Sequence, residues 1–257
     1  MTDVFPPPTL PPKTTVDVWR IELDSDLNHD PGVNLDSILS AEERARAERF
    51  IFSRDASRFR LCRAMLRIGL AWYLQKPPME IALTTKGRGK PCLAEPSSLH
   101  FNVSHSDGLG LIAFTTAGEV GIDVEATQRD FQVLDIAAAN FTRNEEAIIA
   151  AAQTQQEQAD IFLQFWTRKE AVLKAAGCGI LRGLNTVDVS QPFSNLVRLS
   201  GQPDGISESC WVVRDLELTN GFAGAVAAAP GDWSIQLWQM RCDGAKNRII
   251  ERFQGVL

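Results

Sequence analysis

The sequence of 257 residues predicts an α+β fold made of two similar halves, joined near Ala117–Val120. Segments typical of strands and of helices are mixed along the chain, and a pair of strands follows each long helix. A weak repeat relates Phe50–Arg58 and the helix after it to Phe141–Glu145 and the helix Phe165–Lys174, at an offset of roughly 90–110 residues. The content of 44% hydrophobic and 23% charged residues is that of a folded globular protein.

Local signals define the elements of the first half. Ser40 and Glu43 have the spacing of a capping box, which predicts the start of a helix that reaches about Phe52. Asp55 is expected to cap a second helix, which ends near Leu74 because two prolines follow. The other elements expected here are strands at Val16–Leu23, Leu99–Val103 and Leu109–Thr115, with a polar turn at Ser104–Gly108.

The second half is expected to contain helices followed by strands. Gly177 and Gly179 favour the end of the longest helix, because glycine readily adopts the left-handed conformation found there. The tail Cys242–Leu257 contains enough apolar residues to pack as a short helix. The remaining expected elements are helices Val133–Asn140, Asn144–Ala152 and Gln158–Ala176, and strands Thr186–Ser190, Trp211–Leu218, Phe222–Ala228 and Ser234–Met240.

These elements divide the chain into four parts: a Pro-rich, poorly ordered arm at 1–15, an N-terminal half at 16–118, a C-terminal half at 119–241 and a tail at 242–257. The start of the chain lacks the basic and apolar regions of a signal peptide, and no run of about 18 apolar residues predicts a membrane helix. The five cysteines are scattered, without a Cys-x-x-Cys pair. This pattern favours a reducing, cytoplasmic location over a disulfide framework or a zinc site.

The clearest functional signal is Gly121–Glu125. Its alternation predicts a buried strand in which Asp123 and Glu125 share one face, with Cα atoms roughly 6.5 Å apart. Further along, Glu170 and Lys174 lie one turn apart on a predicted helix. Three acids that meet across a cleft are suited to Mg²⁺, which serves phosphate chemistry.

Two plainer interpretations remain open for these acids: a solvated acidic strand face, and an ordinary surface pair on the helix. Gly121 argues against the first, because a missing side chain leaves room for a ligand beside the carboxylates. The apolar residues Phe162, Phe165 and Leu173 argue against the second, since they anchor the helix in a core. Trp166 is expected to contribute to the same packing.

Charge is distributed unevenly. The segment from Arg44 to Lys90 holds 12 basic residues and three acids, whereas the rest of the chain holds 14 basic and 29 acidic residues. A cationic segment in an acidic protein indicates a polyanionic ligand, with a solvated helix surface as the alternative. Within it, the tight turn Gly87–Pro91 is either a phosphate cradle or a hairpin tip.

Four motifs in order closely resemble the 4′-phosphopantetheinyl transferases of the larger, Sfp-like type. They are Gly-Lys-Pro at Gly89–Pro91, Phe-Asn-Val-Ser-His-Ser at Phe101–Ser106, Gly-Ile-Asp-Val-Glu at Gly121–Glu125 and Trp-x-x-Lys-Glu-Ala-x-x-Lys at Trp166–Lys174. The resemblance spans roughly Ser40–Gly183, and it implies a pseudo-dimer with its active site in the cleft between the halves. It also implies holo-[acyl-carrier-protein] synthase activity, in which the phosphopantetheine arm of coenzyme A is transferred to a carrier serine and adenosine 3′,5′-bisphosphate is released.

The same resemblance implies roles for individual residues. Asp123, Glu125 and Glu170 match the magnesium site, where Mn²⁺ is a possible substitute, and Glu170, Glu125 and Lys174 match catalytic positions. Some relatives have basic residues where this chain has Glu43 and Arg46, so a 3′-phosphate contact from Glu43 is excluded. The residues that match positions around coenzyme A are Arg58, Arg88, Gly89, Lys90, Pro91, Ser104, His105, Lys169 and Lys174.

The resemblance further implies partners: acyl or peptidyl carrier domains of fatty acid, polyketide or nonribosomal peptide synthesis, with no nucleic acid and no membrane, and a monomeric enzyme. A magnesium-dependent nuclease or phosphodiesterase is one alternative, and a non-catalytic module that binds coenzyme A or carriers is another. Three converging acids argue against a mere binder. The absence of aromatic residues between Gly87 and Lys90 argues against stacking on nucleic-acid bases.

Overall fold

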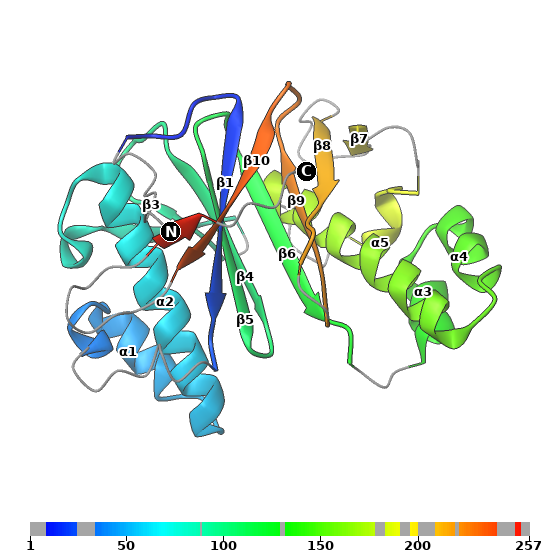
Figure 1. The fold of residues 1–257 in the computed structure, drawn as a ribbon, viewed down its shortest axis with the longest axis horizontal. Coiled ribbons are helices and arrows are strands. Elements are labelled where there is room, and N and C mark those ends of the chain that lie inside the picture. The colour runs from blue at the N-terminus through cyan, green and yellow to red at the C-terminus, as the bar shows by residue number, and fades with distance from the viewer. Residues whose placement is uncertain are drawn as a thin grey trace.

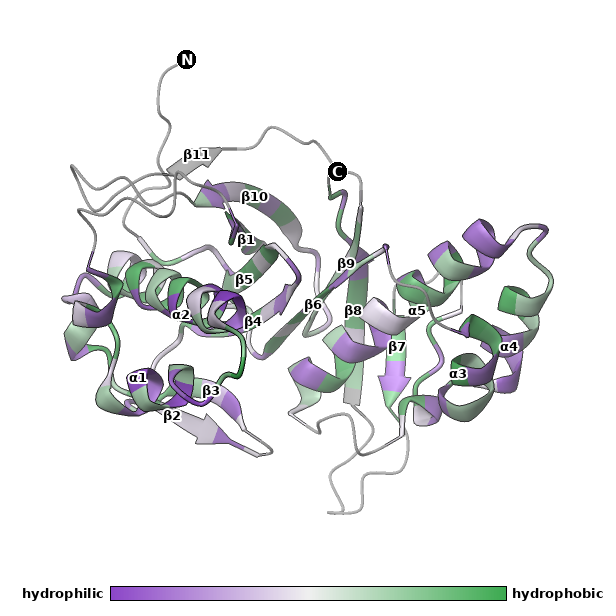
Figure 2. Cartoon of the chain, turned by 90° about the horizontal axis from the view of Figure 1, so that it is seen from below, coloured by the Kyte–Doolittle hydropathy of each residue, from purple (hydrophilic) through white to green (hydrophobic). Residues whose placement is uncertain are grey.

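Four layers make up the fold in the order helix, sheet, sheet, helix (Figure 1). The coordinates are a computed structural model that describes residues 9–24, 34–87, 89–128, 132–177, 183–190, 196–199, 209–218, 221–240 and 250–252. Figure 2 shows the layers from below, with mostly hydrophobic strands in the middle and hydrophilic residues on the helices outside. Within the described residues, no helix has the length and apolar character needed to cross a membrane.

The first sheet has five strands in the order β11 (Ile250–Arg252), β10 (Ser234–Met240), β1 (Thr15–Glu22), β5 (Leu109–Thr115) and β4 (His100–Ser106). β1 and β10 are parallel and the other pairs are antiparallel. β10 lies in the range predicted for the C-terminal half but pairs with the first strand of the chain. The first sheet therefore contains strands from both predicted halves, and the domain boundaries remain a prediction.

The second sheet is antiparallel, with the order β6 (Val120–Ala126), β9 (Phe222–Ala228), β8 (Ser209–Asp215) and β7 (Leu196–Leu199). A separate hairpin pairs β2 (Leu83–Lys86) with β3 (Lys90–Leu93). The helices are α1 (Ala41–Ala47), α2 (Ser53–Leu74), α3 (Val133–Asn140), α4 (Arg143–Ala150) and α5 (Gln155–Ala176). Short 3-10 turns are η2 (Leu35–Ser37), η3 (Pro78–Glu80) and η5 (Leu184–Thr186). The α+β class is confirmed.

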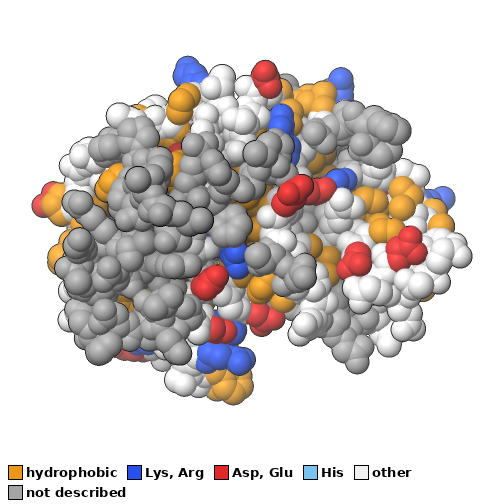
Figure 3. Space-filling model, in the orientation of Figure 1, with side chains coloured by type: hydrophobic (Ala, Val, Ile, Leu, Met, Phe, Trp, Pro, Cys, Tyr) orange, Lys and Arg blue, Asp and Glu red, His pale blue; other side chains and the backbone are white. Residues whose placement is uncertain are grey.

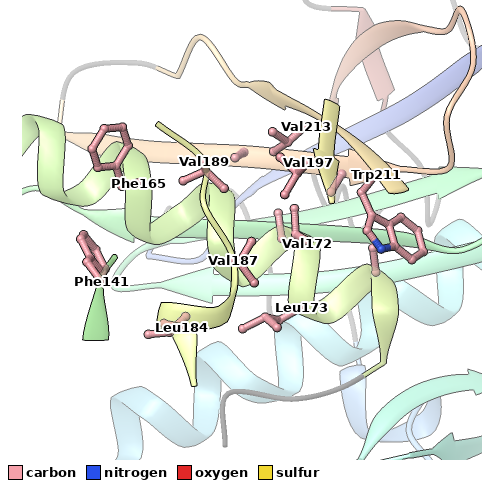
Figure 4. Close-up of a cluster of buried hydrophobic side chains, with 14 of the residues drawn as sticks. Phe141, Phe165, Val172, Leu173, Leu184, Val187, Val189, Val197, Trp211 and Val213 are labelled. Atoms are coloured by element: carbon pink, nitrogen blue, oxygen red, sulfur yellow. The ribbon is translucent and has the colours of Figure 1, made fainter. Parts of the chain in front are cut away.

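Three buried clusters hold the layers together. One lies between α2 and the first sheet, around Trp19, Leu66 and Phe114. A second joins the two sheets, with Val18 and Leu111 from one and Ile122 from the other. The third surrounds α5 and is shown in Figure 4, where valines of β7 and β8 lie close to the helix residues Val172 and Leu173. Since the middle cluster belongs to both sheets, the two lobes share a core.

Capping explains where the helices begin and end. The Ser40–Glu43 capping box forms as predicted, and Thr142 with Glu145 makes a second one at α4. α5 ends at Gly177, whose φ of 70° is left-handed, as expected. The prediction that Asp55 caps α2 is wrong: the helix begins at Ser53, and Asp55 lies in its first turn, where a carboxylate favours the positive helix end.

The internal repeat has an offset of 102 residues, which relates Ser40 to Thr142, Glu43 to Glu145 and Arg67 to Lys169. In each lobe, the buried glutamate of a capping box accepts from a cation on the long helix, and each cation also donates to two carbonyl groups around a 3-10 turn. The carbonyls belong to Pro78 and Ile81 in one lobe and to Leu184 and Val187 in the other. The repeat is therefore real, but Phe50 does not correspond to Phe141.

Two other predicted elements differ. Thr186–Ser190 is not a strand, because its backbone is bound by side chains: the Val189 N–H donates to Glu145, and the Val187 carbonyl accepts from Lys169. The described part of the tail is strand β11 instead of a helix, and the rest of Cys242–Leu257 lies outside the described residues.

Candidate active site

β6 presents two acids to helix α5, as the alternation predicted. Ile122 and Val124 are buried in the core between the sheets, whereas Asp123 and Glu125 lie on the opposite face of the strand. α5 brings Glu170 to the same place, where the charges of Asp123 and Glu125 both raise the pKa of Glu170. Asp123 and Glu170 are buried, and Glu125 is half-buried. Figure 3 shows the molecule hollowed between the lobes, at its lower edge.

Gly121 does not leave room for a ligand, contrary to the prediction. A Cβ at this position would lie 2.0 Å from the Ala171 carbonyl oxygen and 2.4 Å from the Ala175 nitrogen, so the backbone of α5 fills that space. The β9 residues that pair with Gly121 and Asp123 are alanines, so small side chains cover the same face of the sheet. Glycine here therefore allows the helix to approach the strand and places Glu170 beside Asp123.

Lys174 joins the acids through a short network. Its ammonium donates to Asp123 Oδ1 at 2.6 Å, to Ser104 Oγ at 3.1 Å and to the Ile122 carbonyl at 3.3 Å. The Ser104 hydroxyl also donates to Asp123 Oδ1, at 2.9 Å. Ser104 thus orients the acid and the lysine, and its contact with coenzyme A remains a prediction.

Two carboxylate oxygens in this cluster lack a hydrogen bond. Asp123 Oδ2 and Glu170 Oε1 are buried, and no described residue donates to either. Burial, and secondarily the charge of Asp123, raises the pKa of Glu170 to about 7, although Lys174 acts in the opposite direction. Uncompensated buried oxygens are costly, so the site favours a cation or a proton at this point.

Side chains of β4 connect the two sheets along their facing edges. Asn102 Oδ1 accepts from the Ile122 N–H at 2.9 Å, and the Ser106 hydroxyl donates to Glu125 Oε2 at 2.9 Å. Ser106 also accepts from the Ala126 N–H. The predicted polar turn at Ser104–Gly108 is therefore wrong in its first part, since β4 continues to Ser106. Asn102 and Ser106 were not predicted as site residues, although the alternation of polar residues in this strand marks them.

His105 lies on the opposite face of β4 and is exposed. Desolvation by the surrounding chain, and then the charges of Lys174, Arg58 and Arg46, lower the pKa of His105, so the imidazole is neutral at pH 7. Arg58 makes a two-point hydrogen bond with Asp24 and lies 3.8 Å from Asp107. Cations therefore gather around His105, as a phosphate site requires, although Arg58 has acid partners of its own.

The tip of the hairpin between β2 and β3 lies against the end of α5. A Cβ on Gly87 would lie 2.8 Å from the Gly177 carbonyl oxygen, so the tip contacts the end of α5. Lys90 Nζ pairs with Glu119 at 2.8 Å and donates to the Val120 carbonyl at 2.9 Å. The hairpin interpretation of this turn is confirmed, while a phosphate contact from Lys90 remains a prediction.

Two further predicted residues of this turn are described. Gly89 has a φ of 97°, which glycine tolerates best, and Pro91 is the second residue of β3, where it pairs with Thr85. Arg88 lies outside the described residues. The roles of Gly89 and Pro91 around coenzyme A remain predictions.

Lys169 does not face the cleft, so its predicted contact with a diphosphate is wrong. Its side chain is fully buried and pairs with Glu145 at 2.6 Å, above the ring of Phe141. It also donates to the carbonyls of Leu184 and Val187. Trp166 packs against Phe162 in the same core, as predicted.

The basic segment is largely neutralised, which narrows the predicted polyanion surface. Its basic residues pair with acids from outside the segment: Asp24, Asp36, Glu43, Glu95 and Glu119. The paired residues are Arg58, Arg60, Arg63, Arg67, Lys76, Lys86 and Lys90. Among the described residues of the segment, Arg44, Arg46, Arg49 and Arg54 have no acid within ion-pair distance, and of these Arg46 acts on the pKa of His105.

Fold and site together define a two-lobed α+β protein with buried acids and a lysine where β4, β6 and α5 meet. A model of the 4′-phosphopantetheinyl transferase superfamily matches residues 119–229, and a model of the N-terminal region of 4′-phosphopantetheinyl transferases matches residues 33–117. The chain belongs to the 4′-phosphopantetheinyl transferase family.

Three relatives illustrate the similarity. The 4′-phosphopantetheinyl transferase HetI of Nostoc sp. is 32% identical over 87% of this chain and 91% of its own length. Sfp of Bacillus subtilis is 30% identical over 84% of this chain and 93% of its own length. The human L-aminoadipate-semialdehyde dehydrogenase-phosphopantetheinyl transferase is 30% identical over 76% of this chain and 69% of its own.

Proposed function

We propose that this chain transfers the 4′-phosphopantetheine arm of coenzyme A to a serine of an apo acyl or peptidyl carrier protein and releases adenosine 3′,5′-bisphosphate. The observation that carries the proposal is the cluster of Asp123, Glu170 and Lys174 between the two lobes, beside the cationic surroundings of His105. The names of HetI, Sfp and the human relative describe the same class of transfer.

A divalent cation fits the two buried oxygens that lack donors. Asp123 and Glu170 would hold it, with Glu125 behind them, and hard carboxylate oxygens are the ligands that Mg²⁺ and Mn²⁺ prefer. The described residues contain no ready-made group of three metal ligands. In the described structure the Lys174 ammonium binds one oxygen of Asp123. When bound, the cation would neutralise charge on the diphosphate oxygens.

The residues of the chain perform the proton transfers. Glu170 is the general base that accepts the proton of the carrier serine hydroxyl, and its pKa of about 7 is that of the carboxyl without a bound cation. The serine oxygen then forms a bond to the β-phosphorus, and the bond from that phosphorus to the oxygen that bridges the diphosphate breaks. Lys174 stabilises the departing oxygen, which leaves with adenosine 3′,5′-bisphosphate.

Phosphate binding falls to the cationic side of the cleft. A neutral His105 donates one N–H, while Arg58 and Lys174, whose charges both lower the pKa of His105, supply positive charge near it. Ser104 hydrogen-bonds to both Asp123 and Lys174 and so holds the two side chains together. We also propose that the chain acts as a cytoplasmic monomer. Its carriers would belong to fatty acid, polyketide or nonribosomal peptide synthesis.

Mass spectrometry of the acceptor tests this function. An apo carrier protein incubated with coenzyme A, Mg²⁺ and the chain should gain the mass of one phosphopantetheine arm on its serine. Asp123→Asn and Lys174→Met should abolish the gain, whereas Glu95→Gln should retain it, because Glu95 is exposed and pairs only with Lys76 among the described residues. A carrier of unchanged mass with the wild-type chain would refute the proposal.

A further inference from the structure

The connection between α1 and α2 exposes a contiguous apolar surface. Phe50, Ile51 and Phe52 are 37%, 92% and 66% exposed, and Arg49 and Arg54 flank them. We call these five residues the α1–α2 tip. Other large apolar residues that the described structure exposes are separated along the chain and belong to different elements. Contiguous exposed apolar residues are the usual mark of an interaction site.

The fold holds this tip in place. The Phe50 N–H donates to the Ala47 carbonyl at the end of α1, and the Phe52 carbonyl accepts from the Ala56 N–H in the first turn of α2. The Phe50 ring packs on Phe59, with centroids 5.4 Å apart. Because both ends are bonded to helices, Ile51 and Phe52 are presented to solvent by a defined backbone.

Charge sets the tip apart from the helix that follows it. Arg58, Arg60, Arg63 and Arg67 of α2 all lie within salt-bridge distance of an acid. Arg49 and Arg54 are exposed, and no acid of the described chain pairs with either. The tip therefore combines apolar and positive character, which complements a partner that presents apolar residues among acids.

The tip also lies beside the candidate site. Arg58 follows Phe52 by six residues, in the second turn of α2, and lies near Asp107, in the turn that follows β4. Figure 1 shows the beginning of α2 at the lower edge of its lobe, near the turn between β4 and β5. Figure 3 shows basic and apolar side chains together at that edge, next to the hollow between the lobes. A macromolecule seated on the tip would reach the hollow with an adjacent loop or helix end.

We propose that the α1–α2 tip docks the carrier protein, through an acidic surface that contains apolar residues and lies near the acceptor serine. This inference rests on the proposed function and adds the place and chemistry of partner recognition. A membrane is the less favoured occupant, because the apolar part of the tip is a short turn and not an amphipathic helix with a long apolar face.

Steady-state kinetics with an apo acyl carrier protein test the docking. Ile51→Asp with Phe52→Asp should raise the KM for the carrier at least tenfold, and Arg49→Glu with Arg54→Glu should raise it and weaken its dependence on salt. The kcat and the KM for coenzyme A should stay within twofold of wild type. Met79→Asp is the matched control, because Met79 is 70% exposed on η3, and it should change none of these values.

Direct binding separates this inference from the proposed function. Fluorescence anisotropy of a labelled apo carrier should show the same weakening in the tip variants, whether or not the arm is transferred, and the variants should melt with the wild type. Unchanged carrier affinity in both tip variants, or no carrier binding by the wild-type chain, would overturn the docking proposal. Tip-dependent binding to phosphatidylserine vesicles without an effect on the carrier would overturn it in favour of a membrane surface.

Discussion

Glu170→Gln is expected to stabilise the protein in the absence of divalent cations. The carboxyl is buried, and its pKa rises from an ordinary 4.5 to about 7. Between these values the folded protein keeps a proton that the unfolded chain has released. Stability should therefore fall as the pH rises from about 4.5 to 7 and level off above that range.

The size of the effect follows from the same values. At about 1.4 kcal/mol for each pH unit, ionising Glu170 in the folded state costs about 3 kcal/mol above pH 7. A glutamine of nearly equal shape removes that cost, while leaving the packing of α5 unchanged. Below pH 4.5 the wild-type residue is protonated, and the variant should have nearly the same free energy of unfolding.

Urea denaturation at pH 5 and pH 8 with a chelator measures this difference. Glu170→Gln should exceed wild type by about 3 kcal/mol at pH 8 and by only about 0.8 kcal/mol at pH 5. Glu95→Gln, at an exposed position, serves as the control and should match wild type at both values. Adding Mg²⁺ should stabilise wild type more than Glu170→Gln. Equal stabilities of wild type and Glu170→Gln at pH 8 would refute the account of this buried carboxylate.

Three further predictions concern the interior of the C-terminal lobe and the cationic side of the cleft. Lys169→Met should destabilise the fold by about 3–5 kcal/mol, because Glu145 stays buried without its cation. Adding Glu145→Gln should recover part of this loss. A loss under about 1 kcal/mol for Lys169→Met in urea denaturation would contradict a stabilising buried ion pair. Gly121→Ala should lower the free energy of unfolding by about 3 kcal/mol or more, since its Cβ would overlap a main-chain oxygen of α5. The control Gly231→Ala should change it by no more than about 0.5 kcal/mol. Similar melting temperatures of the two variants would disprove the close approach of α5 to β6. His105→Ala should weaken coenzyme A binding by about 1–3 kcal/mol in calorimetry, and unchanged affinity would remove His105 from the phosphate site.

Periodic segments of the sequence were enough to predict much of the fold. β9, β10, α3 and β5 have the expected bounds, because their patterns are long and the residues that end them are distinctive. Thr186–Ser190 looked equally like a strand, with two valines that are indeed buried. Its backbone is bound by Glu145 and Lys169, which are distant in sequence, so no local pattern could exclude a strand.

The acids of the site were predicted from spacing, but the surroundings of each were not. Gly121 was correctly placed beside the acids and given the wrong purpose, since only the packed structure shows a helix against it. Lys169 and Lys174 belong to one motif and carry the same charge. Five residues apart on a helix, they point in different directions, and burial decides that one stabilises the interior and the other faces the acids.

Anomalous diffraction from crystals of the chain soaked with Mn²⁺ and coenzyme A tests the central claim most directly. We expect one strong peak bound by Asp123 Oδ2 and Glu170 Oε1, the two buried oxygens without donors, with Lys174 turned toward the phosphates. A peak at other residues, or no peak while coenzyme A is bound, would contradict a cation site formed by β6 and α5.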